Sequence, residues 1–149
     1  MKTNWQCLSF DSLTNKQLYL ILQARSAVFV VEQNCPYLDA DGVDFECHHL
    51  CAWTEDGKLA AYLRIVPPGL KYPEASLGRV ISSDFARGTG IGKQLLTRGV
   101  EQCLALYPAH PIRIGAQQYL EKFYQGFGFV TVSDMYLEDD IPHVEMLRA

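Results

Sequence analysis

The 149-residue sequence has no apolar stretch of the roughly 20 residues that a helix needs to span a bilayer. Its first residues, 1–5, contain no apolar signal-peptide region. No basic run is present, and 13 basic against 17 acidic residues give a formal net charge of −4 at pH 7. These absences argue against a membrane span and against nucleic-acid binding, and predict a cytoplasmic protein. The negative charge is compatible with an amine-bearing partner.

The sequence also lacks a disulfide framework. Its five cysteines are scattered and odd in number, which predicts reduced thiols. Cys47 and Cys51 flank two histidines, but their spacing follows the period of a strand rather than the C-x-x-C turn of a zinc site. We therefore expect no metal. The hydrophobic share of 48% and the length are typical of one globular domain, which we place at residues 1–149.

The most informative stretch is the glycine loop, residues 87–92, with the sequence Arg-Gly-Thr-Gly-Ile-Gly. It follows a strand-like run, residues 77–83, and precedes a long amphipathic segment. Glycines let the backbone bring several N–H groups toward one point, where the first unpaired amides of the helix add positive potential. Such a loop favours an anion, most often a phosphate.

Spacing excludes two common phosphate-binding motifs. A dinucleotide fingerprint needs a third glycine where Lys93 stands. A Walker A loop needs four residues between its glycines, but only three separate Gly88 from Gly92, and Gln94 occupies the place of the magnesium-binding hydroxyl. If the glycine loop binds a phosphate, the phosphate must belong to another class of ligand. The alternative is that the glycines only form a turn and that Arg87 is a solvent-exposed surface residue.

The periodicity of apolar residues predicts the remaining elements. Strands are expected over residues 5–10, 48–54, 58–66, 77–83, 112–117, 129–132 and 144–147. Helices are expected over residues 15–29, 91–107 and 119–127. This order predicts a mixed sheet with helices on both faces, in which the strands at 77–83 and 112–117 are parallel neighbours. The segment 138–143 is expected to be an acidic loop.

Arg25 lies on the apolar face of the first predicted helix. Either it has an internal carboxylate partner, or its head reaches solvent from the helix rim. The long loop that follows, residues 30–46, makes Glu32, Gln33 and Tyr37 candidates for a substrate wall, because such loops often bind ligands.

Two motifs resemble the GNAT N-acetyltransferases. The first is R-x-x-G-x-G in the glycine loop, and the second is F-Y-x-x-x-G-F at residues 123–129, one strand later. Within that superfamily the chain resembles the ElaA-like branch, through residues 27–37, 78–81, 115–117, 123–124 and 140–143. Asp140 stands where that branch usually has glycine, so the backbone of its loop is expected to differ.

The resemblance implies an α/β (α+β) GNAT-like fold, with a mixed, mostly antiparallel sheet of six to seven strands that splays between the fourth and fifth. It implies acetyl-CoA as co-substrate and no metal. The pyrophosphate would be bound at the loop, and the pantetheine arm along the fourth strand. The implied cofactor-binding residues are Val80, Ile81, Ser82, Arg87, Gly88, Thr89, Gly90, Ile91, Gly92 and Lys93.

Helical periodicity alone would make Tyr124 a core tyrosine, but its position in the second motif resembles that of the family's general acid. A phenol with a pKa of about 10 stays protonated near neutrality and could protonate the departing thiolate. Glu32, His49 and His143 are candidates for the general base, directly or through water, with no choice among them. The expected substrate-binding residues are Arg25, Phe29, Gln33 and His143.

The function that the resemblance implies is direct acetyl transfer from coenzyme A to a primary amine of a small molecule or peptide. Two alternatives stay open. Residues 25–32 have the R-x-x-V-F-x-x-E pattern of acyl-homoserine-lactone synthases, and the chain could also be a non-catalytic module that binds coenzyme A or a protein. The acceptor, the acceptance of longer acyl groups, and the choice between monomer and homodimer are not determined by the sequence.

Overall fold

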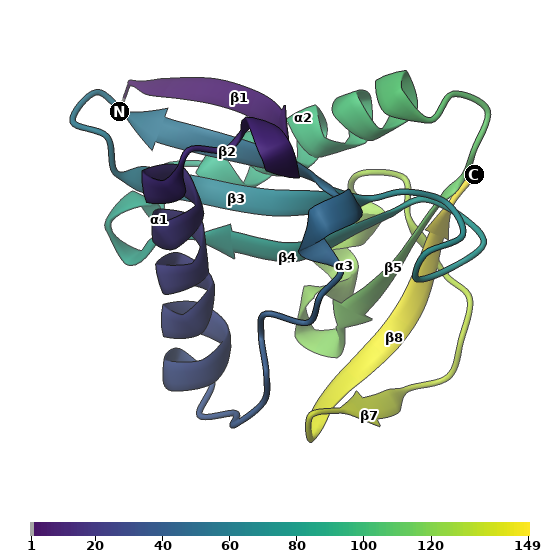
Figure 1. The fold of residues 1–149 in the computed structure, drawn as a ribbon. Helices are drawn as coiled ribbons and strands as arrows, with labels where there is room; N and C mark the ends of the chain where they lie inside the picture. The colour runs from purple at the N-terminus through teal and green to yellow at the C-terminus, as the bar shows by residue number, and fades with distance from the viewer. Residues whose placement is uncertain (1) are drawn as a thin grey trace.

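The computed structural model describes residues 2–149, which form two sheets (Figure 1). The first sheet is antiparallel, in the order β1 (Thr3–Ser9), β2 (His48–Thr54), β3 (Leu59–Val66), β4 (Ser76–Ser82). The second has the order β5 (Ile112–Gln117), β8 (Ile141–Arg148), β6 (Val130–Thr131), and β7 (Tyr136–Glu138) also pairs with β8. This arrangement confirms the expected α+β class of mostly antiparallel strands.

The two sheets meet where β4 and β5 begin. Ala75 and Ile112 form a parallel bridge, and Arg113 N–H donates to Ala75 O at 2.9 Å. Beyond this point no further pairing joins β4 to β5 within the described residues, and Figure 1 shows the two strands diverging. The parallel neighbours that the crossover predicts are therefore splayed strands.

Helices cover both faces of the first sheet. The N-terminus of α1 (Asn15–Arg25) has a capping box, in which Thr14 Oγ1 accepts from Gln17 N–H and the Gln17 side chain accepts from Thr14 N–H. Successive residues of a strand point to opposite faces, so Leu63 packs in the cluster with α2 (Ile91–Leu106), whereas Tyr62 packs with α1. A short helix, α3 (Glu121–Gln125), follows β5.

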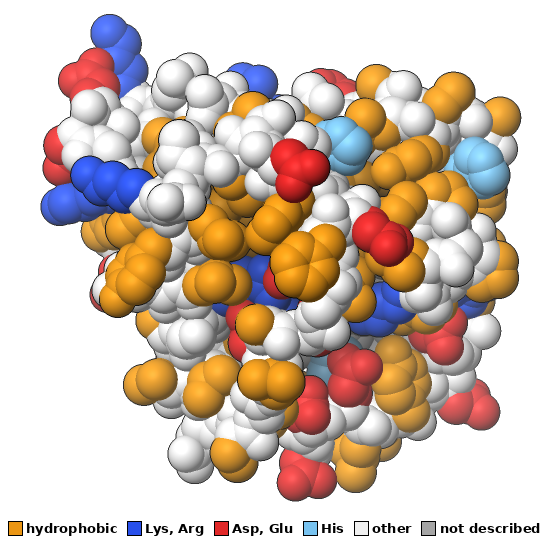
Figure 2. All heavy atoms as spheres, in the orientation of Figure 1, with side chains coloured by type: hydrophobic (Ala, Val, Ile, Leu, Met, Phe, Trp, Pro, Cys, Tyr) orange, Lys and Arg blue, Asp and Glu red, His pale blue; other side chains and the backbone are white. Residues whose placement is uncertain are grey.

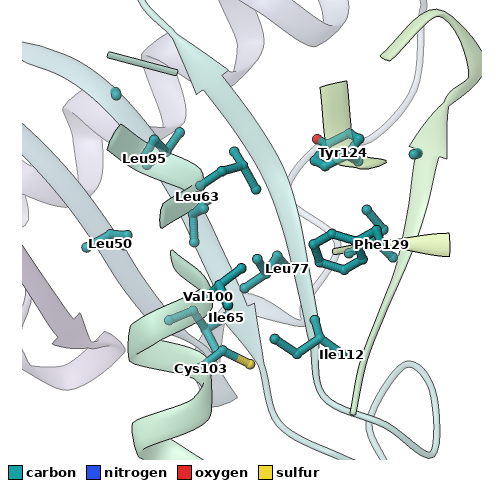
Figure 3. Close-up of a cluster of buried hydrophobic side chains, with 14 of the residues drawn as sticks. Leu50, Leu63, Ile65, Leu77, Leu95, Val100, Cys103, Ile112, Tyr124 and Phe129 are labelled. Carbon is teal, nitrogen blue, oxygen red and sulfur yellow. The ribbon is translucent and has the colours of Figure 1, made fainter. Parts of the chain in front are cut away.

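The larger core joins α2 to both sheets (Figure 3). Leu63 and Leu77 from the first sheet pack with Leu95 and Val100 of α2, while Ile112 and Phe129 continue the cluster on the other side of the splay. Tyr124 belongs to this cluster, and Figure 3 shows its hydroxyl pointing away from Phe129. The core therefore holds the two sheets together behind the splay.

Two segments differ from the sequence-based expectation. The helix predicted to end near Phe29 is α-helical to Arg25 and continues as a π-helix over Ser26–Glu32, a segment rich in valine, which has a lower α-helical propensity. The expected acidic loop is the β7–β8 hairpin, whose turn residues Asp139 and Asp140 have φ of 52° and 61°. Asp140 thus adopts the left-handed conformation that glycine favours.

None of the helices in residues 2–149 is long and apolar enough to cross a membrane.

Candidate active site

The divergence of β4 and β5 opens a cavity of about 410 Å³, which we call the splay cavity. That volume lies in the range of ligand-binding clefts, roughly 300–1,000 Å³. Its lining comes from the π-helix, β4, the glycine loop, α2, the end of β5 and the α3 region: Val28, Phe29, Glu32, Gln33, Val80, Ile81, Ser82, Arg87, Gly92, Leu96, Gln117, Tyr119, Leu120, Phe123 and Tyr124. The structure therefore brings the two sequence motifs to one cavity.

The edge of β4 that borders the splay cavity presents two backbone amides. Ser83 N–H donates to Ala60 O at 2.9 Å, toward β3, and Ile81 pairs with Tyr62 in the same register. Successive residues of a strand point their N–H groups to opposite edges, so the amides of Val80 and Ser82 point toward the splay. The Ile81 amide points toward β3, away from the splay cavity. The prediction that it binds the pantetheine arm is therefore wrong. The Ile81 side chain, 3% exposed, contributes to the cavity wall instead.

The glycine loop leads directly into the N-terminus of α2. Gly88 and Gly90 both have φ of 80°, a conformation that glycine adopts without steric cost. Gln94 N–H donates to Gly90 O at 3.4 Å, the first bond of the helix, so the N–H groups of Ile91, Gly92 and Lys93 precede the helical ladder. Backbone amides in this arrangement favour an anion.

Not every loop side chain faces the cavity. The Ile91 side chain is 5% exposed and packs in the core, so this residue could contribute only its amide to a ligand. Thr89 Oγ1 donates to Ala86 O, which ties the loop to the preceding turn. The Lys93 side chain is exposed outside the cavity lining. Arg87 and Gly92 line the cavity.

Arg87 is held at the mouth of the splay cavity by three contacts. Its Nε donates to Ser82 O at 3.1 Å, and its Nη1 and Nη2 donate to the two Glu32 carboxylate oxygens at 3.0 Å each. Two predicted site residues, one assigned to the cofactor and one to catalysis, are therefore paired with each other.

A second cavity, the hairpin cavity, lies between the β7–β8 hairpin and β4. It shares Phe29, Gln33, Val80, Gln117, Leu120 and Tyr124 with the splay cavity, so the two cavities are neighbours with a common wall. Its other lining residues are Cys35, Tyr37, Lys71, Leu77, Gly78, Arg79, Ile114, Gly115, Glu138, Asp139, Ile141 and His143. On the face shown in Figure 2, basic side chains are recessed at the centre and acidic side chains gather where Figure 1 places the β7–β8 turn.

Tyr124 lies where the two cavities join. Its side chain is 6% exposed, packs edge-to-face on Phe123 and Phe129, and makes no hydrogen bond with any described residue through its hydroxyl. Burial raises the pKa of Tyr124 above the ordinary value of a phenol. The hydroxyl therefore has a proton to donate, and it has no hydrogen-bond partner among the described residues.

His143 lies in the hairpin cavity with one nitrogen fixed. Its Nδ1–H donates to Ile141 O at 2.7 Å, so in the neutral ring Nε2 carries the lone pair, 3.4 Å from Glu138 Oε2. The ring stacks on Tyr136, with centroids 5.9 Å apart. Sequence reasoning did not single out Glu138, because the pairing of β7 with β8 that brings it opposite the histidine was not predicted.

Phe29 and Gln33, two of the residues predicted to bind substrate, line both cavities. Gln33 Oε1 accepts from Gln117 Nε2 at 3.3 Å, across the splay from the π-helix to β5. Tyr37 lines the hairpin cavity. Arg79, which sequence reasoning did not select, lines the same cavity.

Arg25 is not part of either lining. It is fully buried, and its guanidinium donates to Asp39 Oδ2 at 2.8 Å and to Asp44 Oδ1 at 2.7 Å. The internal carboxylate partner expected from the helix pattern is confirmed. The expected direct contact of Arg25 with substrate is corrected, because the buried side chain reaches no cavity.

His49 is likewise remote from the cavities. It is 1% exposed, its Nε2–H donates to Asp44 O at 3.0 Å, and its Nδ1 accepts from the Tyr62 hydroxyl at 2.6 Å. Burial lowers the pKa of His49, which keeps the ring neutral. Both nitrogens are occupied inside the fold, so His49 is corrected from a candidate base to a structural residue.

Comparisons with known proteins agree with this geometry. A family model described as acetyltransferase (GNAT) domain matches residues 43–148. Protein ElaA of Escherichia coli K12 is 45% identical over 146 residues, which cover 97% of this chain and 95% of ElaA. Both the family model and ElaA span most of the chain.

Solved structures show the same likeness. The crystal structure of an acyl-CoA N-acyltransferase from Pseudomonas aeruginosa superposes with a TM-score of 0.94 at 45% identity, covering 99% of this chain and all of that one. The crystal structure of Escherichia coli ElaA gives a TM-score of 0.93 at 43% identity, with the same coverage. The chain therefore belongs to the GNAT acetyltransferase family, in its ElaA-like branch.

Proposed function

We propose that residues 1–149 form one acetyltransferase domain, which moves an acetyl group from acetyl-CoA directly to a primary amine of a small molecule or peptide. The observation that carries the proposal is that the two cavities share a wall that includes Val80 and Tyr124. The splay cavity begins at the glycine loop and ends at Tyr124, where the hairpin cavity begins. One substrate can enter from each side and meet at the tyrosine.

The chain offers matching groups for coenzyme A along the splay cavity. The amides of Ile91, Gly92 and Lys93, which precede the helical ladder, would bind the pyrophosphate. Val80 and Ser82, whose amides point into the splay, would bind the pantetheine arm and the thioester carbonyl. A backbone N–H aimed at that carbonyl oxygen would stabilise the negative charge that develops on it during attack.

Tyr124 would act as the general acid. The amine nitrogen forms a bond to the thioester carbon, the carbon–sulfur bond breaks, and the departing thiolate takes the phenolic proton. The proton that the acetylated nitrogen then loses returns to the Tyr124 phenolate, which restores the phenol. Because burial raises the pKa of Tyr124, the phenol is protonated near neutral pH and has a proton to donate. Phe123 and Phe129 hold the ring by edge-to-face packing.

Of the three candidate bases, His143 is the best supported. Its Nδ1–H bond to Ile141 O leaves Nε2 able to take a proton from the incoming ammonium, directly or through a water. The Glu138 carboxylate, 3.4 Å from Nε2, would then stabilise the imidazolium. Glu32 is engaged by Arg87, and His49 is buried elsewhere.

Supplying the protein with acetyl-CoA and a panel of primary amines, and measuring free thiol, tests the proposal. We expect thiol release that depends on the amine, together with an acetylated amine detected by mass spectrometry. Binding of coenzyme A without thiol release for any amine would contradict the proposal and favour a non-catalytic module. Thiol release only with long-chain acyl-CoA would contradict the acetyl assignment and favour an acyl-homoserine-lactone-synthase-like acyltransferase.

A further inference from the structure

Strand β4 contains a β-bulge at the edge of the splay cavity. Ile81 pairs with Tyr62 and Gly78 pairs with Arg64, so two residues of β4, Arg79 and Val80, lie opposite the single residue between their partners on β3. A bulge sets the local register, and a one-residue change of register turns backbone groups toward the opposite edge. The direction of the Val80 N–H therefore depends on this bulge.

Arg79 has the backbone conformation that makes the bulge unusual. Its φ is 50°, in the left-handed region, where a residue with a Cβ is disfavoured and glycine is the common choice. A residue in this conformation persists only where its surroundings hold it. The local sequence provides a glycine next to this position, at Gly78, but not at it.

The Arg79 side chain is held by contacts far along the chain. Its Nε lies 2.8 Å from Asp39 Oδ1, and its Nη2 donates to Asp39 O at 3.1 Å and to Asp41 Oδ2 at 3.3 Å. The guanidinium also lies over the Tyr37 ring, 5.6 Å from its centroid, and over the Phe29 ring, at 6.0 Å.

Those carboxylates are themselves fixed by other arginines. Arg64 binds Asp41 through Nη1 and Nη2, each at 2.8 Å, and Arg25 binds Asp39 through Nε at 2.8 Å. Both arginines have side chains that are only 1% exposed. The anchor for Arg79 is thus a network of charges with two buried arginines and a buried Asp39, and with Asp41 at its solvent-exposed edge.

We propose that Arg79 is a positioning residue for acyl transfer: its anchored side chain holds the left-handed bulge and thereby aims the Val80 amide into the splay cavity. Val80 lines both cavities, at the place where the thioester carbonyl is expected. The effect of Arg79 on the rate of acetyl transfer rests on the proposed function. Its effect on the backbone of β4 does not depend on that function.

A pair of substitutions separates the backbone role from other roles. Arg79→Ala removes the guanidinium contacts but keeps a Cβ, so the left-handed conformation stays sterically unfavourable. Arg79→Gly removes the guanidinium contacts and the Cβ, so glycine can adopt the left-handed conformation without that penalty. In single-turnover acetyl transfer we expect Arg79→Ala to be slower than wild type by about 10- to 100-fold, as for partial loss of an oxyanion donor. Arg79→Gly should exceed Arg79→Ala by about 5- to 30-fold, the range that the left-handed penalty gives.

Two further readouts complete the test. Affinity for free coenzyme A should stay within about twofold of wild type in both variants, because the pyrophosphate loop is untouched and free coenzyme A lacks the acetyl carbonyl that the Val80 amide would bind. Amide NMR of the free protein should show the Val80 resonance shifted in Arg79→Ala and close to wild type in Arg79→Gly. This second readout needs no turnover, so it stands even if the chain transfers no acetyl group.

Equal rates and equal Val80 resonances for the two variants would overturn the inference, since the side chain would then act by direct contact or not at all. If Arg79→Ala fails to fold, Asp41→Asn replaces it, because that change weakens one anchor of Arg79 and leaves Asp39 in place. Asp41→Asn should shift the Val80 resonance in the same direction by a smaller amount, and an unchanged resonance would equally overturn the inference.

Discussion

Arg87 and Glu32 form a bidentate ion pair, with both nitrogen–oxygen distances at 3.0 Å, that joins the glycine loop to the end of the π-helix. The two side chains are about half exposed. Both line the mouth of the splay cavity, so the carboxylate competes with any anion that approaches Arg87 there. If coenzyme A binds at Arg87 as proposed, we expect Glu32 to affect its affinity although Glu32 lies far from the glycine loop in sequence.

Glu32→Gln should raise the affinity for coenzyme A by about two- to fivefold, because an exposed ion pair contributes little and its removal frees Arg87 for the pyrophosphate. Calorimetric titration with coenzyme A measures this change. Glu101→Gln, at an exposed position of α2, removes the same charge and should leave the affinity unchanged. Weaker binding by Glu32→Gln alone would show that Glu32 contributes to the site instead of competing for Arg87.

Gly90→Asp should weaken coenzyme A binding by at least about tenfold, because it places a carboxylate at the N-cap of α2, where the pyrophosphate charge is expected. Gly57→Asp is a matched control. Gly57 has φ of 83° against 80° for Gly90, and a Cβ added at either position would meet no heavy atom within 4 Å, so both variants carry similar backbone strain. Equal affinities for the two folded variants would mean that the glycine loop does not bind the pyrophosphate.

The sequence predicted those parts of the fold and site that depend on local pattern. The bounds of β2 and β5 were predicted to the residue, and the glycine loop and Tyr124 lie at one cavity as their motifs indicate. Periodicity and glycine spacing act over a few residues, so one sequence suffices to detect them.

Features that depend on long-range pairing were not predicted. Arg79 carries no local signal of its left-handed backbone, because its stabilising carboxylates lie 38 and 40 positions earlier in the chain. Glu138 was placed in a loop, since only the pairing of β7 with β8 shows that it faces His143. His49 resembled a catalytic candidate until its burial and its two hydrogen bonds were known.

Arg25→Met should lower the melting temperature by about 10 °C, because it leaves Asp39 and Asp44 buried without one partner, a loss on the order of 3–5 kcal/mol. Thermal unfolding followed by circular dichroism measures the shift. Lys16→Met removes a cation from an exposed position of the same helix and should change the melting temperature by no more than about 2 °C. A shift for Arg25→Met as small as that control would show that the buried network contributes little to stability.

Acid should destabilise the protein in two steps. Burial lowers the folded-state pKa of His49 below its unfolded value of about 6.5, so the stability from its neutral form is present above that pH and is lost as the pH falls. Burial alone would raise the pKa of Asp41, but hydrogen bonds from Arg64 lower it below its usual value. The free energy of unfolding should therefore fall further below about pH 5, as Asp41 becomes protonated.

His49→Gln tests the first step, because glutamine does not titrate. Its free energy of unfolding should fall less between about pH 6.5 and 5 than that of wild type, as measured by urea denaturation. His110→Gln changes an exposed histidine and should leave the wild-type pH dependence intact. An identical slope for His49→Gln and wild type would show that His49 does not cause the loss.

Acetyl transfer at Tyr124 is the central claim, and single-turnover transfer by Tyr124→Phe tests it most directly. The phenylalanine keeps the edge-to-face packing on Phe123 and Phe129 and removes only the hydroxyl. Tyr19→Phe makes the same change at an exposed tyrosine of α1 and serves as the control. We expect Tyr124→Phe to transfer acetyl about 10²- to 10⁴-fold more slowly than wild type, with coenzyme A affinity nearly unchanged. A single-turnover rate equal to that of wild type, in a folded variant, would contradict the claim.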